Sequence, residues 1–193
     1  MCWSDAVWRL IRTALALVAG VSLTSCVHLP PPASPAEIQA LSAALTSLQP
    51  DVRAAEATDV AALAYDYPCQ LAAEYRLVRP PLLHNLLINL GLKKRGLCYQ
   101  WTEDLLAKLQ SLPLDSLELH WGVSHWGTIR EHNTVVVTAR HQPFLAGIVL
   151  DPWRRSGVLV WRRVSADSYP WQEGELLAPP PPARVATALA TPR

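Results

Sequence analysis

The stretch HNTVVVTARHQPFLAGIVLD, residues 132–151, decides the fold. It holds two runs of β-branched and aliphatic residues, which favour strands, and a His-Gln-Pro sequence between them that interrupts the strand pattern. Two strands joined by so short a connection pair as an antiparallel hairpin, with the turn at residues 140–144. The sequence therefore predicts a β-hairpin that begins at His132 and ends at Asp151.

The two ends of this hairpin set its register. Placing His132 opposite Asp151 predicts that Val135 faces Ile148 on the same side of the sheet. Facing residues have Cβ atoms roughly 4.5–5.5 Å apart, so the carboxylate can orient the imidazole and stabilise its protonated form. An unpaired charge at the end of an apolar strand would be costly, which is a second reason to expect a partner for Asp151.

Around the hairpin, the sequence predicts an α+β domain. Two further short strands are expected, at residues 117–123 and 158–161, which gives an antiparallel sheet of about four strands. Apolar residues at helical spacing precede the sheet, so an N-terminal helical half is expected to pack on it. The strongly apolar run at 82–92 is predicted to be a buried helix closed by the Lys93-Lys94-Arg95-Gly96 sequence. The other predicted helices lie between Ser34 and Pro50 and at residues 51–65, 69–78 and 98–109.

Cys98 is the strongest candidate for a reactive residue. It follows the glycine turn at Gly96 and opens the predicted helix at 98–109. The positive end of a helix dipole favours a thiolate at that position. If the hairpin brings the His132 imidazole to this sulfur, the imidazole can remove the thiol proton.

Three short motifs occur in the order seen in a known group of enzymes. They are Arg95-Gly96-Leu97-Cys98 at the start of a helix, Glu131-His132-Asn133 at the start of a strand, and Leu150-Asp151-Pro152-Trp153. Together they resemble the transglutaminase-like, papain-related cysteine enzymes. The resemblance covers about residues 82–164.

The resemblance implies a role for each member of the trio. Cys98 would be the nucleophile, His132 the general base and Asp151 the orienting carboxylate. Members of the family cleave or transfer amide bonds through a thioester, as peptidases, amidases or acyltransferases, and no cofactor or metal is expected. Some relatives have lost activity and serve only in binding, so an inactive binding or structural lipoprotein is the alternative.

The resemblance also implies an oxyanion site. Such enzymes pair the backbone N–H of the nucleophile with a side-chain donor, often a Gln or Trp ahead of the Cys. This chain has no Trp between Cys26 and Cys98. The expected donors are therefore the backbone N–H of Cys98 together with Asn85 or Asn89 from the preceding helix, or Trp121 from the first strand.

Simpler interpretations of the same residues remain open. Cys98 could be an inert thiol or form a disulfide with Cys69, because exported proteins meet an oxidising compartment. His132 could be a hydrogen-bonded residue at a strand end. The spacing of His120, His125 and His141 does not predict a metal site. Arg154, Arg155, Arg162 and Arg163 are expected to form a solvated basic edge.

The N-terminus predicts export and lipid attachment. Two arginines precede an uncharged run of 11 residues at 13–23, which is too short to span a bilayer comfortably. The Leu23-Thr24-Ser25-Cys26 sequence that follows resembles the lipobox of bacterial lipoproteins, which implies cleavage before Cys26 and a lipid on that residue. Val27 stands where the inner-membrane retention signal is Asp, so the cell envelope, at the periplasmic face of the outer membrane, is the expected location.

Charge and composition describe the rest of the chain. Removal of residues 1–25 takes away two of 17 basic and one of 16 acidic side chains, which leaves a neutral chain without a basic field for nucleic acid. The expected partners are the membrane, through the lipid on Cys26, and a peptide or protein substrate in the envelope. Residues 26–33 are expected to form a Pro-rich tether, 34–177 the transglutaminase-like domain, and 178–193 a disordered Pro-rich tail.

Overall fold

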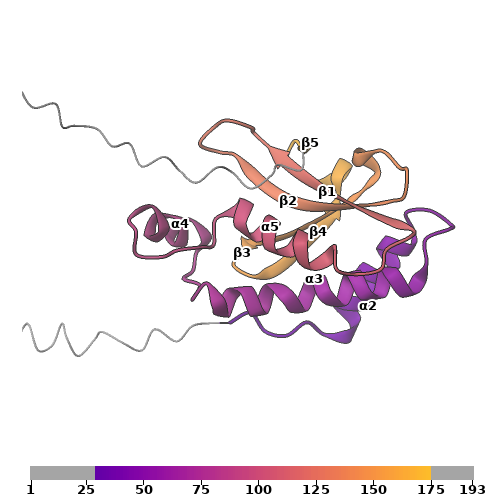
Figure 1. Cartoon of the computed structure of the whole chain (residues 1–193), viewed down its shortest axis with the longest axis horizontal. Coiled ribbons are helices and arrows are strands. Elements are labelled where there is room, and N and C mark those ends of the chain that lie inside the picture. The colour runs from indigo at the N-terminus through magenta and orange to yellow at the C-terminus, as the bar shows by residue number, and fades with distance from the viewer. Residues whose placement is uncertain (1–28, 175–193) are drawn as a thin grey trace, which may run out of the picture.

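The computed structural model describes residues 29–174, in which four α-helices precede a five-stranded antiparallel sheet packed against them (Figure 1). The predicted α+β class is confirmed. The predicted export signal, the lipid on Cys26 and the tail at 178–193 lie outside the described residues. The elements are α2 (Pro35–Thr46), α3 (Ala54–Glu74), α4 (Pro81–Asn89), α5 (Cys98–Leu109), β1 (Leu117–Ser124), β2 (His132–Ala139), η1 (Phe144–Ala146), β3 (Ile148–Arg155), β4 (Val158–Arg163), η2 (Val164–Ala166) and β5 (Gln172–Gly174).

The sheet has the strand order β4-β3-β2-β1-β5. β1 to β4 form a meander, as predicted, and β5 adds an edge strand beside β1. β5 is three residues long, and its pairing places Val123 opposite Gln172 and Trp121 opposite Gly174. A strand of three residues has too few positions to show an alternating pattern. The sequence therefore predicted about four strands and missed β5.

The predicted register of the β2–β3 hairpin is wrong by two residues. Val135 pairs with Leu150 and not with Ile148. The short 3-10 helix η1 lies in the connection, so the connection extends further into the second apolar run than the His-Gln-Pro sequence indicates. Because side chains alternate with a period of two, a shift of two residues keeps every side chain on its predicted face. His132 and Asp151 therefore stay on one face as diagonal neighbours.

α3 is a single helix of 21 residues, although the sequence predicted two helices, at 51–65 and 69–78. Pro68 lies inside it and is buried. A proline in a helix interior costs about 3 kcal/mol because it lacks an N–H for the backbone ladder. The buried face of the helix continues on both sides of this residue, through Ala64 before it and Leu71 after it. Packing along the whole face therefore outweighs the local break.

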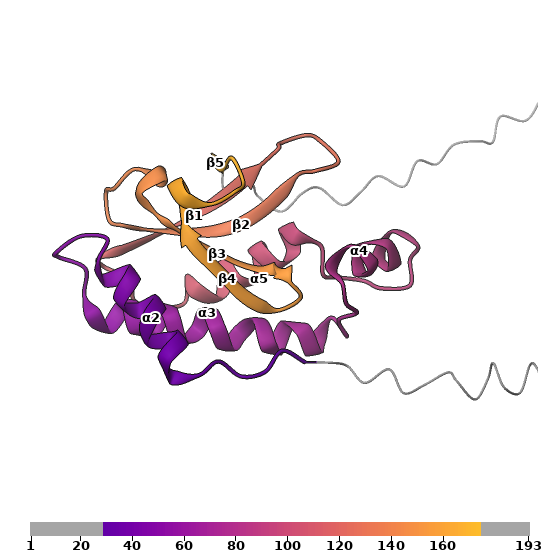
Figure 2. The ribbon, with the colours of Figure 1, turned by 180° about the vertical axis from the view of Figure 1, so that it is seen from behind.

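α4 is not the buried helix that its leucine content predicts. His84 is its only buried residue, and most of its leucines are exposed. The helix also ends earlier than expected, at Asn89, where Gly91 with a φ of 73° turns the chain, and not at Gly96. Figures 1 and 2 show α4 outside the main layers, at one end of the molecule. An apolar run on several faces of a helix predicts burial from sequence alone, but it does not specify what covers the helix.

The main core lies between the sheet and the helices on one side of it (Figure 2). Leu105 and Leu109 of α5 pack with Val135 and Val137 of β2, and all four side chains are fully buried. α2 and α3 cover the remaining part of this layer with Leu41, Leu45, Ala57, Val60, Ala61 and Ala64. Since α5 runs along β2, the first residue of α5 comes to lie beside the first residue of β2.

Candidate functional site

Cys98 is the first residue of α5, as predicted, and the turn before it is held by Gln100. The side-chain oxygen Oε1 of Gln100 accepts the backbone N–H of Gly96 at 2.8 Å and that of Leu97 at 3.1 Å. The indole N–H of Trp101 donates to the carbonyl oxygen of Gly96 at 3.0 Å. These bonds satisfy backbone groups that a helix start leaves free, so the thiol is presented from a rigid turn.

Gly96 and His84 form the tightest contact of this turn. Gly96 has a φ of 128°, and a Cβ built on it would lie 2.3 Å from Nε2 of His84. The backbone N–H of Val78 donates to Nδ1 of the imidazole at 3.2 Å, so Nε2 carries the proton and donates to the carbonyl oxygen of Arg95 at 2.9 Å. A fully buried imidazole from α4 thus supports the backbone turn that precedes Cys98.

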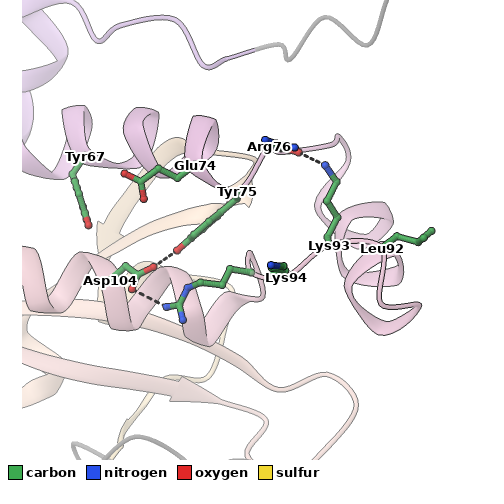
Figure 3. Close-up of a pocket in the computed structure, with 9 residues that line it drawn as sticks. Tyr67, Glu74, Tyr75, Arg76, Leu92, Lys93, Lys94 and Asp104 are labelled. Carbon is green, nitrogen blue, oxygen red and sulfur yellow. Dashed lines mark hydrogen bonds and ion pairs between the residues drawn. The ribbon is translucent and has the colours of Figure 1, made fainter. Parts of the chain in front are cut away.

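Arg95 anchors the turn from its other side. Its guanidinium donates to Glu103 at 2.9 Å and to Asp104 at 2.7 Å, and Asp104 also accepts the hydroxyl of Tyr75. Arg95, Tyr75 and Asp104 line a pocket of about 720 Å³ (Figure 3). Neither Cys98 nor His132 lines this pocket. Burial and the bond to Asp104 raise the pKa of Tyr75, so the phenol stays a neutral donor. The hydrogen bonds among Arg95, Tyr75 and Asp104 therefore support the turn before Cys98.

His132 is fixed by a hydrogen bond to Asp151. Its Nε2 lies 2.6 Å from Oδ2 of Asp151, and the two side chains are 3% and 1% exposed. The carboxylate accepts, so Nε2 is the donor. The other ring nitrogen, Nδ1, is buried and has no hydrogen-bond partner among residues 29–174. The Cys98 thiol lines the same cleft as His132, and it donates to the carbonyl oxygen of Glu131 at 3.8 Å. A turn of the thiol from this carbonyl toward Nδ1 would join the two side chains.

The surroundings of His132 favour its protonated form. Burial by itself lowers the pKa of His132, but the hydrogen bond to Asp151 and the neighbouring Cys98 outweigh burial and raise the pKa to about 9. The rings of Trp153, Tyr169 and Trp171 stand 4.8, 5.0 and 5.4 Å from the imidazole, centroid to centroid. An imidazole held this way can take up a proton from a thiol and keep it close to the sulfur.

Asp151 has a second cationic partner in Arg154. Nε of Arg154 lies 2.6 Å from Oδ2 of Asp151, and its NH2 group donates to Asp167 at 2.7 Å. The sequence placed Arg154 on a solvated basic edge, which is wrong, because β3 is irregular between Asp151 and Arg155 and turns this side chain inward. The guanidinium also stacks over Tyr169 at 4.5 Å. The other three arginines of the predicted edge are all exposed: Arg155, Arg162 and Arg163.

Asn133 is a site residue that the sequence analysis missed. Its Nδ2 lies 3.9 Å from the sulfur of Cys98, and its Oδ1 accepts the indole N–H of Trp121 at 2.7 Å. The bond from Trp121 fixes the amide orientation, so the NH₂ group is on the side of the thiol, where one of its two N–H groups also donates to Oε1 of Glu131 at 3.2 Å. Side chains alternate along β2, so Asn133 and His132 point to opposite faces. Both lie near the Cys98 sulfur because the start of β2 is beside the start of α5.

The three predicted oxyanion side chains lie in different surroundings. The indole N–H of Trp121 is already donated to Asn133, so Trp121 is not a free donor. Asn85 lines the cleft, where its Oδ1 accepts the indole N–H of Trp153 at 3.4 Å. Asn89 is an exposed residue at the end of α4 and does not line the cleft. Asn133 and Asn85 are therefore the amides that the structure places near the thiol.

Cys98 and His132 open onto a cleft of about 500 Å³. Its walls come from four places: α4, the connection between β1 and β2, β3, and the segment that leads to β5. The wall residues are Leu82 and Asn85, then His125, Ile129, Arg130 and Glu131, then Ser168 and Tyr169, with Trp153 from β3. A cleft of this size, whose walls combine apolar side chains with polar and charged ones, can hold a short extended peptide segment.

The interpretation of Cys69 and Cys98 as a disulfide pair is not supported. Cys69 and Cys98 are both free thiols, and Cys69 donates from α3 to the carbonyl oxygen of Tyr65. Burial raises the pKa of Cys69. His120 bonds to Glu173 and Thr138 across the sheet. Within residues 29–174, no three His, Cys, Asp or Glu side chains gather as metal ligands would.

Comparison of the chain with protein-family models, with curated proteins and with solved structures finds no match. In the part of the chain that the structure describes, no helix has the length and apolar character needed to cross a bilayer. The chemistry of the site must therefore be derived from its own geometry.

The contact between Gly96 and His84 predicts a substitution effect with a matched control. Gly96→Ala adds a methyl group 2.3 Å from the imidazole, whereas Gly91→Ala adds one at a position with positive φ and nothing within 4 Å. Both variants bear the cost of a left-handed residue, about 1–2 kcal/mol. The additional clash should make Gly96→Ala clearly less stable than Gly91→Ala in urea denaturation, and equal losses would contradict the contact.

The raised pKa of His132 predicts a pH-dependent stability. A group whose pKa is higher in the folded state stabilises the fold fully below its unfolded pKa, near 6.5, and that stabilisation is lost as the pH rises through about 9. The difference in free energy of unfolding between the wild type and His132→Gln should fall by on the order of 3 kcal/mol between pH 6 and pH 10. Chemical denaturation across this range measures it, and parallel curves for the two proteins would refute the linkage.

Proposed function

We propose that the protein is a membrane-anchored envelope lipoprotein with a transglutaminase-like Cys-His-Asp site, which cleaves or transfers amide bonds through a thioester. One observation carries this proposal: a thiol at a helix start and an imidazole line one cleft, and a fully buried carboxylate holds that imidazole by a hydrogen bond. The order of the three residues along the chain supports it, because it matches the resemblance noted in the sequence.

The reaction begins with proton transfer from Cys98 to Nδ1 of His132. The thiolate sulfur then attacks the carbonyl carbon of an amide, and the carbonyl electrons move to its oxygen. As the tetrahedral intermediate collapses, the C–N bond breaks and the imidazolium gives its proton to the leaving nitrogen. The products are a free amine and a thioester on Cys98, while the carboxylate of Asp151 holds the imidazole in the same orientation throughout.

A second half-reaction releases the acyl group. Water or an amine enters the cleft, and His132 takes a proton from it as the new bond to the carbonyl carbon forms. The C–S bond then breaks and the sulfur recovers a proton from the imidazolium. Water gives hydrolysis and an amine gives transfer, and the open cleft beside Cys98 admits both.

Two N–H groups are placed to stabilise the oxyanion. The backbone N–H of Cys98 belongs to the first turn of α5, where no partner inside the helix exists for it. The amide of Asn133 points at the sulfur because Trp121 holds its oxygen. Together they supply a backbone donor and a side-chain donor, the pair that acyl transfer requires.

The lipid on Cys26 and the location at the periplasmic face of the outer membrane belong to the same proposal. They are supported by the residues of the lipobox and by Val27 after the cysteine. A peptide or protein of the cell envelope is then the substrate that shares a compartment with the site.

Alkylation by iodoacetamide tests the activated thiol, with Cys69 as an internal control. Both sulfurs are half-buried, but only Cys98 has an imidazole beside it. Near pH 7, Cys98 should be alkylated at least about tenfold faster than Cys69, and His132→Ala should remove that advantage. Peptide mass spectrometry after timed quenching gives both rates in one sample. Equal, slow labelling of the two cysteines would favour the inactive binding lipoprotein.

The proposed role of Asn133 in stabilising the oxyanion can be distinguished from a role in activating the thiol by comparing two reactions of Cys98. Alkylation forms no oxyanion, whereas acylation by p-nitrophenyl acetate does. Asn133→Ala should therefore slow acylation of Cys98 by about 10²–10³ while leaving its alkylation rate nearly unchanged. Release of p-nitrophenolate and the mass of the acyl-enzyme measure the first rate. A parallel loss in both reactions would show that Asn133 supports the thiol itself and not the oxyanion.

A further inference from the structure

The leucines of α4 form an exposed apolar stripe. Leu82 and Leu86 of α4 and Leu90, the residue that caps its C-terminus, follow one another at intervals of four residues, which places them along one face. They are 71%, 51% and 62% exposed. Leu92, in the turn after the helix, is 68% exposed. So much leucine surface on one short helix is unusual for a protein face that contacts only water.

A second exposed apolar group stands next to this helix. Trp126 and Ile129, in the connection between β1 and β2, are both exposed, and Ile129 is fully so. Ile129 and Leu82 line the same cleft, which places the connection and the helix on two sides of its mouth. The exposed leucines of α4 and the turn after it, with Trp126 and Ile129, are called the apolar rim below.

Basic residues border the apolar rim. The chain has no Asp or Glu between Glu74 and Glu103. Figure 3 shows Leu92, Lys93 and the backbone of Arg76 together beside α4, and Lys93 donates to the carbonyl oxygen of Arg76 at 2.7 Å. Within residues 29–174 no carboxylate forms an ion pair with Arg76, Arg79, Lys93, Lys94 or Arg130.

The described chain begins at the same end of the molecule. Pro30 is buried, and its ring packs so closely on Gly157 that a Cβ there would lie 2.8 Å from it, with Ala72 of α3 beside it. α3 leads into α4, and Figures 1 and 2 both show α4 and the start of the described chain at one end of the long axis. In the sequence, Cys26 is only four residues before Pro30.

We propose that the apolar rim docks on the surface of the anionic lipid bilayer that holds the anchor, with the leucines of α4 among the acyl chains and the basic residues at the headgroups. An exposed helix with leucines on one face, followed by a turn that carries lysines, has the character of an interfacial segment, and with nine residues it is too short to span. The proposal rests on the lipid attachment at Cys26 in the proposed function, and adds the orientation of the body.

Docking in this way determines what the cleft can reach. Leu82 and Ile129 belong both to the rim and to the walls around Cys98, so the cleft opens at the level of the headgroups. The amide that reacts would then belong to a molecule attached to the membrane or lying on it.

Nitroxide labels at two matched leucines test the docking in the full, lipidated chain. Leu90 and Leu145 are both 62% exposed, but Leu145 lies in η1, beyond the far end of β2. Leu90→Cys and Leu145→Cys would each be labelled in a Cys69→Ser, Cys98→Ser background and reconstituted in vesicles of phosphatidylethanolamine and phosphatidylglycerol. Collision with oxygen reports lipid surroundings, and collision with a water-soluble nickel chelate reports water. The label at 90 should favour oxygen by several-fold over the label at 145.

Two outcomes would overturn the docking. One is equal accessibility of both labels to the nickel chelate in a protein that floats with the vesicles, which leaves the anchor intact and points to a protein partner for the rim. The other is failure to float at all, which removes the lipid attachment as well. Lys93→Glu combined with Lys94→Glu should return the label at 90 to water at low salt, and an unchanged label would refute the role of the charges. Because Cys98 is absent from these variants, the result is independent of whether the thiol is catalytic.

Discussion

The fully buried carboxylate of Asp151 is the constraint around which this end of the molecule is organised. An unpaired charge there would destabilise the fold by several kcal/mol, so the groups around it have to supply compensating charge and hydrogen bonds. Arg154 and His132 do so, and the backbone N–H of Trp153 adds a third bond at 3.0 Å. The irregularity in β3 turns Arg154 inward, and the same contacts fix the imidazole. Stability and chemistry at this site therefore have a common origin.

The parts of this arrangement that follow local rules could be predicted from sequence. The Ser34 cap, the strands of the meander and the position of Cys98 at a helix start depend on neighbours in the chain. The trio itself was a prediction from order and spacing. Asn133 was missed because its contact with the sulfur arises where the start of β2 meets the start of α5. Arg154 was missed because side chains do not alternate between the two faces along an irregular strand.

α4 shows a further limit of prediction from sequence. Its leucine content indicates that the helix should be buried, but it does not indicate which surface would cover the helix. Its single buried side chain, His84, donates to the carbonyl oxygen of Arg95 and contacts Gly96. The helix that exposes its leucines and the backbone turn before Cys98 are thus linked through one imidazole. Any displacement of α4 would be felt first at the Gly96 turn.

The rings around His132 give the molecule a built-in optical signal. Protonated imidazole is an efficient quencher of indole fluorescence at short range, and Trp153 and Trp171 lie within 5.4 Å of this one, centroid to centroid. Emission from these two indoles should brighten whenever the ring loses its proton. The charge state of His132 could then be followed in real time, with no dye attached.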